Sequence, residues 1–142
     1  MAESGLVAHE TTRVVLGAFF YVYNKLGHGF LESVYHRALA NTLERVGCAV
    51  EREAELRVYF EGLEVGVFRA DLIVNGRVIV EVKAVDQLAR AHEAQIINYL
   101  RAAELPVGLL LNFGPRATYR RLVGPAANRR GQPRVTDVDA ST

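Results

Sequence analysis

The sequence predicts an α/β fold with a central mixed sheet, in which an antiparallel three-stranded meander is flanked by helices. Two stretches near the N-terminus carry apolar residues at helical spacing. Apolar and polar residues then alternate through most of residues 50–85, as in half-buried strands. A third helical stretch separates this region from the continuous apolar run VGLLLNF, which is typical of a buried strand. Helices packed on such a sheet form an α/β sandwich.

The two N-terminal helices are expected at Thr11–Leu26 and at about Leu31–Val46. Thr11 and Thr12 are candidate N-caps, because a threonine hydroxyl accepts a hydrogen bond from a free amide at the start of a helix. On this interpretation, residues 1–10 form an N-terminal extension that precedes the folded domain.

Five strands and one further helix are expected after residue 49. Asn75-Gly76, between two apolar alternations, is a strong signal for a hairpin turn. The predicted domain covers residues 11–123, and residues 124–142, rich in Pro, Ala, Asn, Arg and Gly, are expected to be flexible. In chain order, the expected elements are the strands Val50–Phe60, Glu64–Val74 and Arg77–Val85, the helix Leu88–Ala103, and the strands Val107–Phe113 and Thr118–Val123.

Composition favours one domain in a reducing compartment. The chain has 142 residues, half of them hydrophobic, which is enough apolar material for a core. The single cysteine, Cys48, cannot form an internal disulfide, and the N-terminus lacks the pattern of a secretory signal. No apolar stretch is long enough to cross a membrane, so we expect a cytoplasmic protein. Because the net charge is only +1, any phosphate-binding surface is expected to be a local patch.

The hairpin FRADLIVNGRVIVEVKAV carries the main candidate site. Its even-numbered residues are apolar, whereas the odd-numbered positions collect the charges. A two-residue Asn-Gly loop would place odd positions of one strand beside even positions of the next, which would mix charge into the core. A three-residue loop, or a one-residue bulge, keeps the parities aligned and brings Asp71 near Glu81 and Lys83. We predict that register.

Asp71, Glu81 and Lys83 would together form a compact hydrolytic site. Two carboxylates on neighbouring strands suit Mg²⁺, with Mn²⁺ as an alternative, and such an ion polarises a phosphoryl group and activates water. Lys83, two residues after Glu81, would orient that water and stabilise the developing charge. Arg69 shares the odd-numbered face and is a candidate substrate contact. The alternative is a solvated surface of mutually paired charges.

Two helices carry further polar candidates. Glu32 either interacts with the dipole of its helix or delivers a third carboxylate to the metal, and Tyr35, one turn later, is a candidate substrate contact. His92, Gln95 and Tyr99 form a polar stripe on the later helix. Gln95 would hold a water or a phosphate oxygen, and His92 would act as an acid or contact the substrate backbone. Tyr99 is a further candidate substrate contact. The alternative for His92 and Tyr99 is local hydrogen bonding where the helix meets the sheet.

A basic region lies toward the C-terminus. It either contacts phosphates or forms a solubilising surface. No series of aromatic residues accompanies it, so it does not support specificity for single strands. Its members are Arg116, Arg120, Arg121, Arg129, Arg130 and Arg134.

The segment GFLESVY, with Gly29, Glu32 and Tyr35, resembles the naming motif of the GxxExxY family, a branch of the PD-(D/E)XK nuclease superfamily. The hairpin, the segment HEAQIINYL and the strand VGLLLNFG resemble later blocks of that family in the same order. The resemblance covers roughly Thr11–Val123 and implies the superfamily core of helix, meander, helix and strand.

The resemblance also implies roles for individual residues. It implies metal ligation by Asp71 and Glu81, a catalytic Lys83, and support from Glu32 and Gln95. The superfamily motif begins with a proline, and alanine stands at that position, 70, in this chain. The metal chemistry belongs to the carboxylate that follows, so this departure leaves the predicted centre intact.

Two functions are consistent with these features. The first is a Mg²⁺-dependent nuclease that acts on DNA or RNA. The second is a nucleic-acid- or protein-binding module that keeps the nuclease fold without turnover. The near-neutral net charge and the lack of a separate recognition domain favour the second function more than the motif does. A homodimer or a protein partner is expected where a substrate groove needs more surface than one small domain offers.

Overall fold

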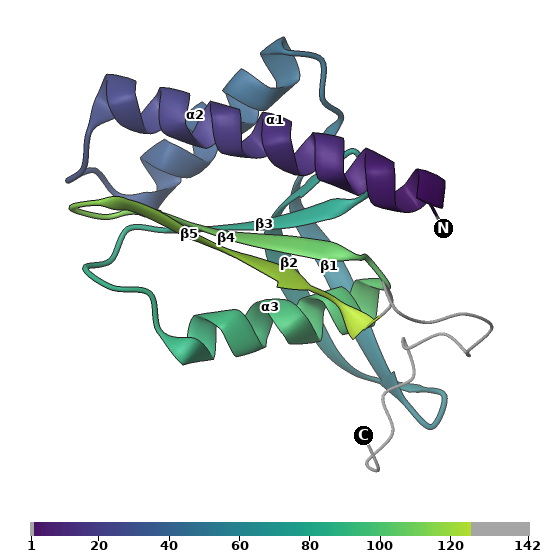
Figure 1. Ribbon diagram of the computed structural model, residues 1–142. Coiled ribbons are helices and arrows are strands. Elements are labelled where there is room, and N and C mark those ends of the chain that lie inside the picture. Colours follow the sequence, from purple (N-terminus) through teal and green to yellow (C-terminus); the bar gives the residue numbers. More distant parts are fainter. Residues whose placement is uncertain (1, 126–142) are drawn as a thin grey trace.

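The computed structural model describes residues 2–125 as three helices and one five-stranded sheet (Figure 1). The strands lie in the order β1-β2-β3-β4-β5, and the α/β class with a mixed sheet flanked by helices is confirmed. Most of the segment predicted to be flexible, 126–142, lies outside the described residues. The elements are α1 (Ala2–Leu26), α2 (Glu32–Arg45), β1 (Val50–Phe60), β2 (Leu63–Val74), β3 (Val78–Lys83), α3 (Arg90–Ala103), β4 (Val107–Phe113) and β5 (Ala117–Val123).

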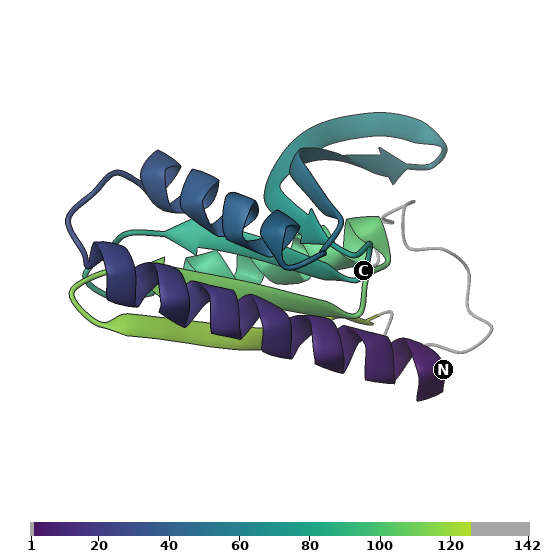
Figure 2. The ribbon, with the colours of Figure 1, turned by 90° about the horizontal axis from the view of Figure 1, so that it is seen from above.

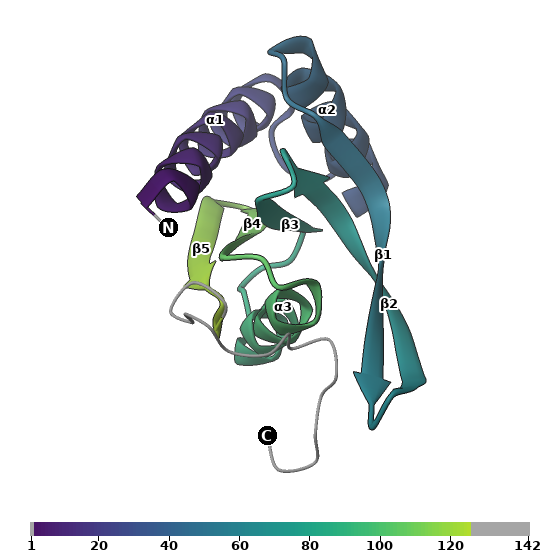
Figure 3. The ribbon, with the colours of Figure 1, turned by 90° about the vertical axis from the view of Figure 1, so that its right-hand side faces the viewer.

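The sheet is mixed because a helix connects two of its strands. β1, β2 and β3 form the predicted antiparallel meander. α3 then returns the chain so that β4 runs parallel to β3, and β5 pairs antiparallel with β4. α1 and α2 cover one face of the sheet and α3 covers the other (Figures 1 and 3). Helices on both faces bury all of β4 and all of β3 except Lys83.

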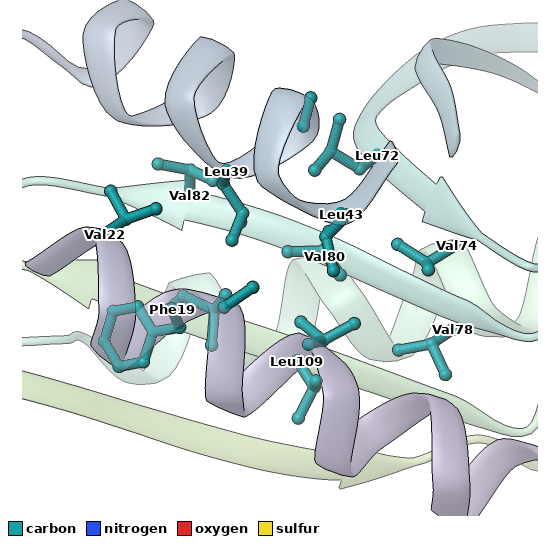
Figure 4. Close-up of a cluster of buried hydrophobic side chains, with 14 of the residues drawn as sticks. Phe19, Val22, Leu39, Leu43, Leu72, Val74, Val78, Val80, Val82 and Leu109 are labelled. Atoms are coloured by element: carbon teal, nitrogen blue, oxygen red, sulfur yellow. The ribbon is translucent and has the colours of Figure 1, made fainter. Parts of the chain in front are cut away.

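Each face of the sheet has its own hydrophobic core. The larger cluster lies beneath α1 and α2 and includes Leu72 (Figure 4). The second cluster lies beneath α3 and includes Ile73 and Ile79. The odd-numbered face of the hairpin, which collects the charges, is thus covered by α3, and the assignment by parity is wrong at one residue. Ala70, assigned by parity to the first core, packs in the second, so β2 changes face at Asp71.

The β1–β2 ribbon continues beyond its pairing with β3. The last residue pair between β2 and β3 is Leu72 with Val80, whereas β1 and β2 stay paired as far as Phe60 with Leu63. At the branch point, Glu53 of β1 has a φ of 48°, which is uncommon for a residue other than glycine. Figures 2 and 3 show the ribbon bending out of the sheet and passing alongside α3.

The first helix is longer than predicted. α1 begins at Ala2, so Thr11 and Thr12 lie inside the helix and do not cap it. The Thr12 hydroxyl donates to the carbonyl oxygen of Ala8 at 2.7 Å, the bond that threonine makes inside a helix. The start of this helix that was predicted from the candidate N-caps, Thr11, is therefore wrong. Among residues 2–125, no helix is long and apolar enough to cross a membrane.

The loop between β2 and β3 has three residues, as predicted. Val74 pairs with Val78, so residues 75–77 form the loop. Its first two residues, Asn75 and Gly76, have φ values of 54° and 61°, a left-handed conformation that these two residue types tolerate best. The confirmed register keeps even positions beside even positions and odd beside odd.

Asn112 fixes the segment that follows β3. The side chain is 1% exposed, and it both accepts from the Val85 N–H and donates to the Val85 carbonyl, each at 2.9 Å. A side-chain amide therefore replaces a neighbouring strand for this backbone. The contact holds the chain at the point where it leaves Lys83 and turns toward α3.

We expect Asn112→Ala to lower the free energy of unfolding by about 1–3 kcal/mol, because it leaves two backbone groups of Val85 without partners. Chemical denaturation monitored by circular dichroism measures this loss. Thr118→Val is the control, since Thr118 receives only a long 3.4 Å hydrogen bond from Asn112. Equal effects of the two variants would contradict the assigned role.

Candidate active site

Two carboxylates cross between β2 and β3 at the point where the pairing of these strands ends. The Asp71 N–H donates to Oε2 of Glu81 at 2.6 Å, and the Val82 N–H donates to Oδ2 of Asp71 at 2.8 Å. Each side chain therefore accepts a backbone amide of the opposite strand, in place of a ladder hydrogen bond. We call these two hydrogen bonds the carboxylate clasp.

The clasp holds both carboxyl groups away from water. Glu81 is 5% exposed and Asp71 is half-buried. Burial, and after it the neighbouring charge of Asp71, raise the pKa of Glu81 to about 8. Burial also raises the pKa of Asp71, although the hydrogen bond from Val82 opposes the rise. Two like charges held together in this way favour a cation beside them.

Lys83 brings a positive charge to the clasp from the end of β3. It is half-buried and lies two residues after Glu81, so the two side chains share one face of the strand. The positive charge of Lys83 lowers the pKa of both carboxyl groups, against the effect of burial. The structure thus brings Asp71, Glu81 and Lys83 together, and their catalytic roles stay predictions.

Glu32 approaches from α2 but stands beside the clasp. Its Oε2 accepts a hydrogen bond from the Ala84 N–H at 3.4 Å, just after β3. Its negative charge raises the pKa of Asp71 and of Glu81, so it lies within electrostatic reach of both. Within residues 2–125, however, no three His, Cys, Asp or Glu side chains are gathered closely enough to hold a metal ion. The structure therefore supports a pair of carboxylates without Glu32 as the third member.

His36 contacts the site and was missed by sequence reasoning. Its Nε2 lies 3.0 Å from the carbonyl oxygen of Asp71, and because a carbonyl only accepts, the ring proton of this bond belongs to Nε2. Side chains thus bind both backbone groups of Asp71. The signal was present in the spacing, since His36 lies one helical turn after Glu32 on the same face of α2.

α3 brings Tyr99 and Gln95 toward the clasp. The Gln95 side chain donates to the Tyr99 hydroxyl at 2.9 Å. Burial, and after it the charge of Glu81, raise the pKa of Tyr99, which places its hydroxyl within electrostatic reach of the carboxylates. His92 instead accepts the Ala89 N–H through Nδ1 at 3.1 Å and closes the first turn of α3. This is the local role that was the alternative for His92.

The predicted basic contacts lie apart from the clasp. Arg69 is exposed on the β1–β2 ribbon, 3.9 Å from Glu55. Arg116 and Arg120 line a hollow of about 410 Å³ between β5 and the segment that joins β3 to α3. Arg121 is exposed on β5, and the other three arginines of the basic region, at 129, 130 and 134, lie outside the described residues.

Tyr35 is fully buried and organises the turn between α1 and α2. Its hydroxyl donates to the Gly27 carbonyl at 2.7 Å and accepts the Phe30 N–H at 3.2 Å. Gly29, in the same turn, has a φ of 113°, which favours glycine. A side chain with no exposed surface cannot contact a substrate, so the contact predicted for Tyr35 is replaced by a structural role. The turn presents Glu32 as the first residue of α2.

The donor set of the clasp fits a hard divalent cation. The hydrogen bonds of the clasp use one oxygen of Asp71 and one of Glu81. Mg²⁺ takes one or two protein carboxylates and keeps several waters, so these two residues are sufficient to hold it. A divalent cation would also offset the negative charges whose burial raises both pKa values.

The fold and the clasp define an α/β protein of the nuclease-like class. Residues 9–122 match the PD-(D/E)XK nuclease superfamily, and the chain belongs to this superfamily. A search of curated proteins found no match.

The fold is similar to the crystal structure of SSO0001, with a TM-score of 0.52 and 22% sequence identity. The similarity covers 66% of this chain and 50% of that chain, so this chain matches half the length of SSO0001. At this level of identity the similarity shows the fold alone.

We expect Tyr35→Phe to lower the free energy of unfolding by about 1–3 kcal/mol, because the Phe30 amide and the Gly27 carbonyl lose a buried partner. Denaturant titration measures the loss. Tyr21→Phe is the matched control, since Tyr21 is 48% exposed on α1. A Tyr35→Phe protein with unchanged stability and weakened substrate binding would restore the predicted role in substrate contact.

The stability of the metal-free protein should fall as the pH rises from about 4.5 to about 8. The pKa of Glu81 is raised from 4.5 to about 8, so in this range the folded state binds a proton that the unfolded state has released. Thermal unfolding in EDTA across this range measures the slope, which Glu81→Gln should reduce. Glu55→Gln, at an exposed position, is the control. An unchanged slope in Glu81→Gln would contradict the assigned burial.

Proposed function

We propose that this protein is a metal-dependent nuclease that hydrolyses phosphodiester bonds of DNA or RNA. The observation that carries the proposal is the carboxylate clasp, with Lys83 beside it on β3. Buried carboxylates whose pKa values are raised by burial beside a second charged group are typical of functional centres. Membership of the PD-(D/E)XK nuclease superfamily supports the same chemistry.

Asp71 and Glu81 are the residues that would hold Mg²⁺, with Mn²⁺ as the alternative ion. When bound, the ion would polarise a phosphoryl oxygen and lower the pKa of a water, which makes that water a better nucleophile. The Lys83 ammonium would orient the attacking water and stabilise negative charge on the phosphoryl oxygens. His36 acts as a positioning residue in this proposal, because it fixes the backbone of Asp71.

Gln95 and Tyr99 complete the proposed site on the α3 side. Gln95 donates to the Tyr99 hydroxyl, and its side-chain carbonyl can accept from a water. Glu32 binds the Ala84 amide and thereby supports the end of β3, next to Lys83. We propose that Glu32 acts through this support and through its charge.

We further propose that the chain belongs to the GxxExxY branch of the superfamily. Gly29, Glu32 and Tyr35 carry the motif in sequence. Their structural roles are connected, since the glycine and the tyrosine build the turn that presents the glutamate. This division of roles explains why the three residue types occur together.

The alternative function is a nucleic-acid- or protein-binding module without turnover. The observation that favours it concerns Glu32, which was predicted as a third metal ligand. Within residues 2–125, Glu32 does not join Asp71 and Glu81 in a group that could hold a metal ion. A nucleic-acid partner is proposed for the nuclease and for the nucleic-acid-binding form of the alternative. A homodimer or a protein partner would add surface to the hollow lined by Arg116 and Arg120.

We expect cleavage of single- or double-stranded DNA or RNA that requires Mg²⁺ or Mn²⁺. Lys83→Ala should reduce the rate by about 10²–10³-fold, the usual cost of losing one charge-stabilising group. Asp71→Asn and Glu81→Gln should abolish both cleavage and metal binding, measured by gel assay and by isothermal titration calorimetry.

Lys25→Ala is the control for these variants, because Lys25 is exposed on α1 and lies outside the proposed site. Cleavage that survives Asp71→Asn and Lys83→Ala would come from a contaminant or from another site. Binding of nucleic acid without any cleavage would favour the alternative function.

A further inference from the structure

A cavity of about 510 Å³ lies between the β1–β2 ribbon and α3. Figure 3 shows the ribbon and the helix that form its two walls. Tyr99 belongs both to this cavity and to the surroundings of the clasp, since the charges of Glu81 and Asp71 reach its hydroxyl. The lining residues are Val58, Phe68, Ala91, His92, Ala94, Gln95, Asn98 and Tyr99.

Aromatic rings from the two walls meet in this cavity. The ring centroids of Phe68 and Tyr99 are 5.8 Å apart, with the planes tilted by 43°. Phe68 is 45% exposed, so part of its ring is open for a ligand to pack against. Gly66 leaves room for that ring, because a Cβ at this position would lie 3.3 Å from its edge. The ribbon thus presents the ring of Phe68 to the cavity and leaves part of that ring exposed.

The polar side chains that line the cavity are two amides, one imidazole and one phenol, from Gln95, Asn98, His92 and Tyr99. Gln95 and Asn98 each carry donors and acceptors in one plane, as the edges of nucleobases do. The lining contains no lysine, arginine, aspartate or glutamate. A phosphate group would find no lysine or arginine here, whereas a flat, neutral, hydrogen-bonding ring would find both a stacking surface and edge partners.

We propose that this cavity, the base pocket, receives an unpaired nucleobase of the substrate next to the phosphate held at the clasp. This proposal rests on the proposed nuclease function and specifies its substrate as nucleic acid with at least one unstacked base. A base within a duplex is stacked on both faces and paired at its edge, so it would have to leave the helix before Phe68 could stack on it.

The test compares two single strands of equal length, one intact and one with abasic positions throughout, so that both carry the same phosphates. Their dissociation constants are measured by fluorescence anisotropy with the Lys83→Ala protein in Mg²⁺, in which cleavage during the titration is expected to be slower by about 10²–10³-fold. The intact strand should bind more tightly by about 5- to 150-fold for each base that stacks. Phe68→Ala in the same background should remove most of this preference, and Phe68→Trp should keep it.

Val67→Ala is the matched control, because Val67 is 46% exposed, adjacent in sequence, and outside the lining of the cavity. Thermal unfolding shows whether each variant is folded. Equal binding of the intact and the abasic strand would overturn the base pocket. A preference for the intact strand that Phe68→Ala leaves unchanged would also overturn it, and would leave the cavity to another occupant, such as an apolar side chain of a protein partner.

Cleavage of the intact strand by the wild-type protein in Mg²⁺ is measured in parallel. Cleavage without a preference for bases would overturn the base pocket and leave the proposed nuclease function standing. A preference for bases that depends on Phe68, without cleavage, would support the base pocket and overturn the nuclease function. If the protein neither binds nor cleaves the strand, both the base pocket and the nuclease function are overturned.

Discussion

The structure depends on the exchange of two hydrogen bonds between Asp71 and β3. The Asp71 amide binds the Glu81 carboxylate and the Val82 amide binds the Asp71 carboxylate, so two side chains take over where the ladder between β2 and β3 ends. Without these acceptors the amides would be left unpaired in a largely buried position, at a cost of about 1–3 kcal/mol each. The clasp therefore allows the sheet to branch: β3 stays with β4, and β2 leaves with β1.

The branch creates both proposed functional features at once. On one side, it leaves the carboxylates at the opening between the strands, within reach of Lys83 and of α2. On the other side, the departing ribbon carries Phe68 past α3 and opens the base pocket. The burial that raises the pKa of Glu81 weakens the metal-free fold above about pH 4.5. Such a local cost is typical of a site shaped for a ligand, because the bound cation would offset it.

Sequence reasoning was strongest where the determining interactions are local. The parity of the hairpin and the Asn75-Gly76 pair were enough to predict its three-residue loop. The start of α1 was wrong because a threonine has the same appearance in sequence whether it caps a helix or binds a carbonyl inside one. Packing between segments that are far apart in the sequence could not be predicted. Parity could not show that β2 changes face at Asp71, nor that Phe68 would meet Tyr99 across the cavity.

The double role of Asp71 and Glu81 decides how the site has to be probed. Alanine at either position would remove a carboxylate and also free a buried amide of the opposite strand, so a loss of activity would not separate chemistry from shape. Asparagine and glutamine keep an oxygen that accepts the same amide while they remove the charge. Lys83 accepts no backbone hydrogen bond, because an ammonium is only a donor, so its removal leaves the clasp intact. Binding to the base pocket is therefore best measured in the Lys83→Ala background, where the branch that forms the pocket is preserved.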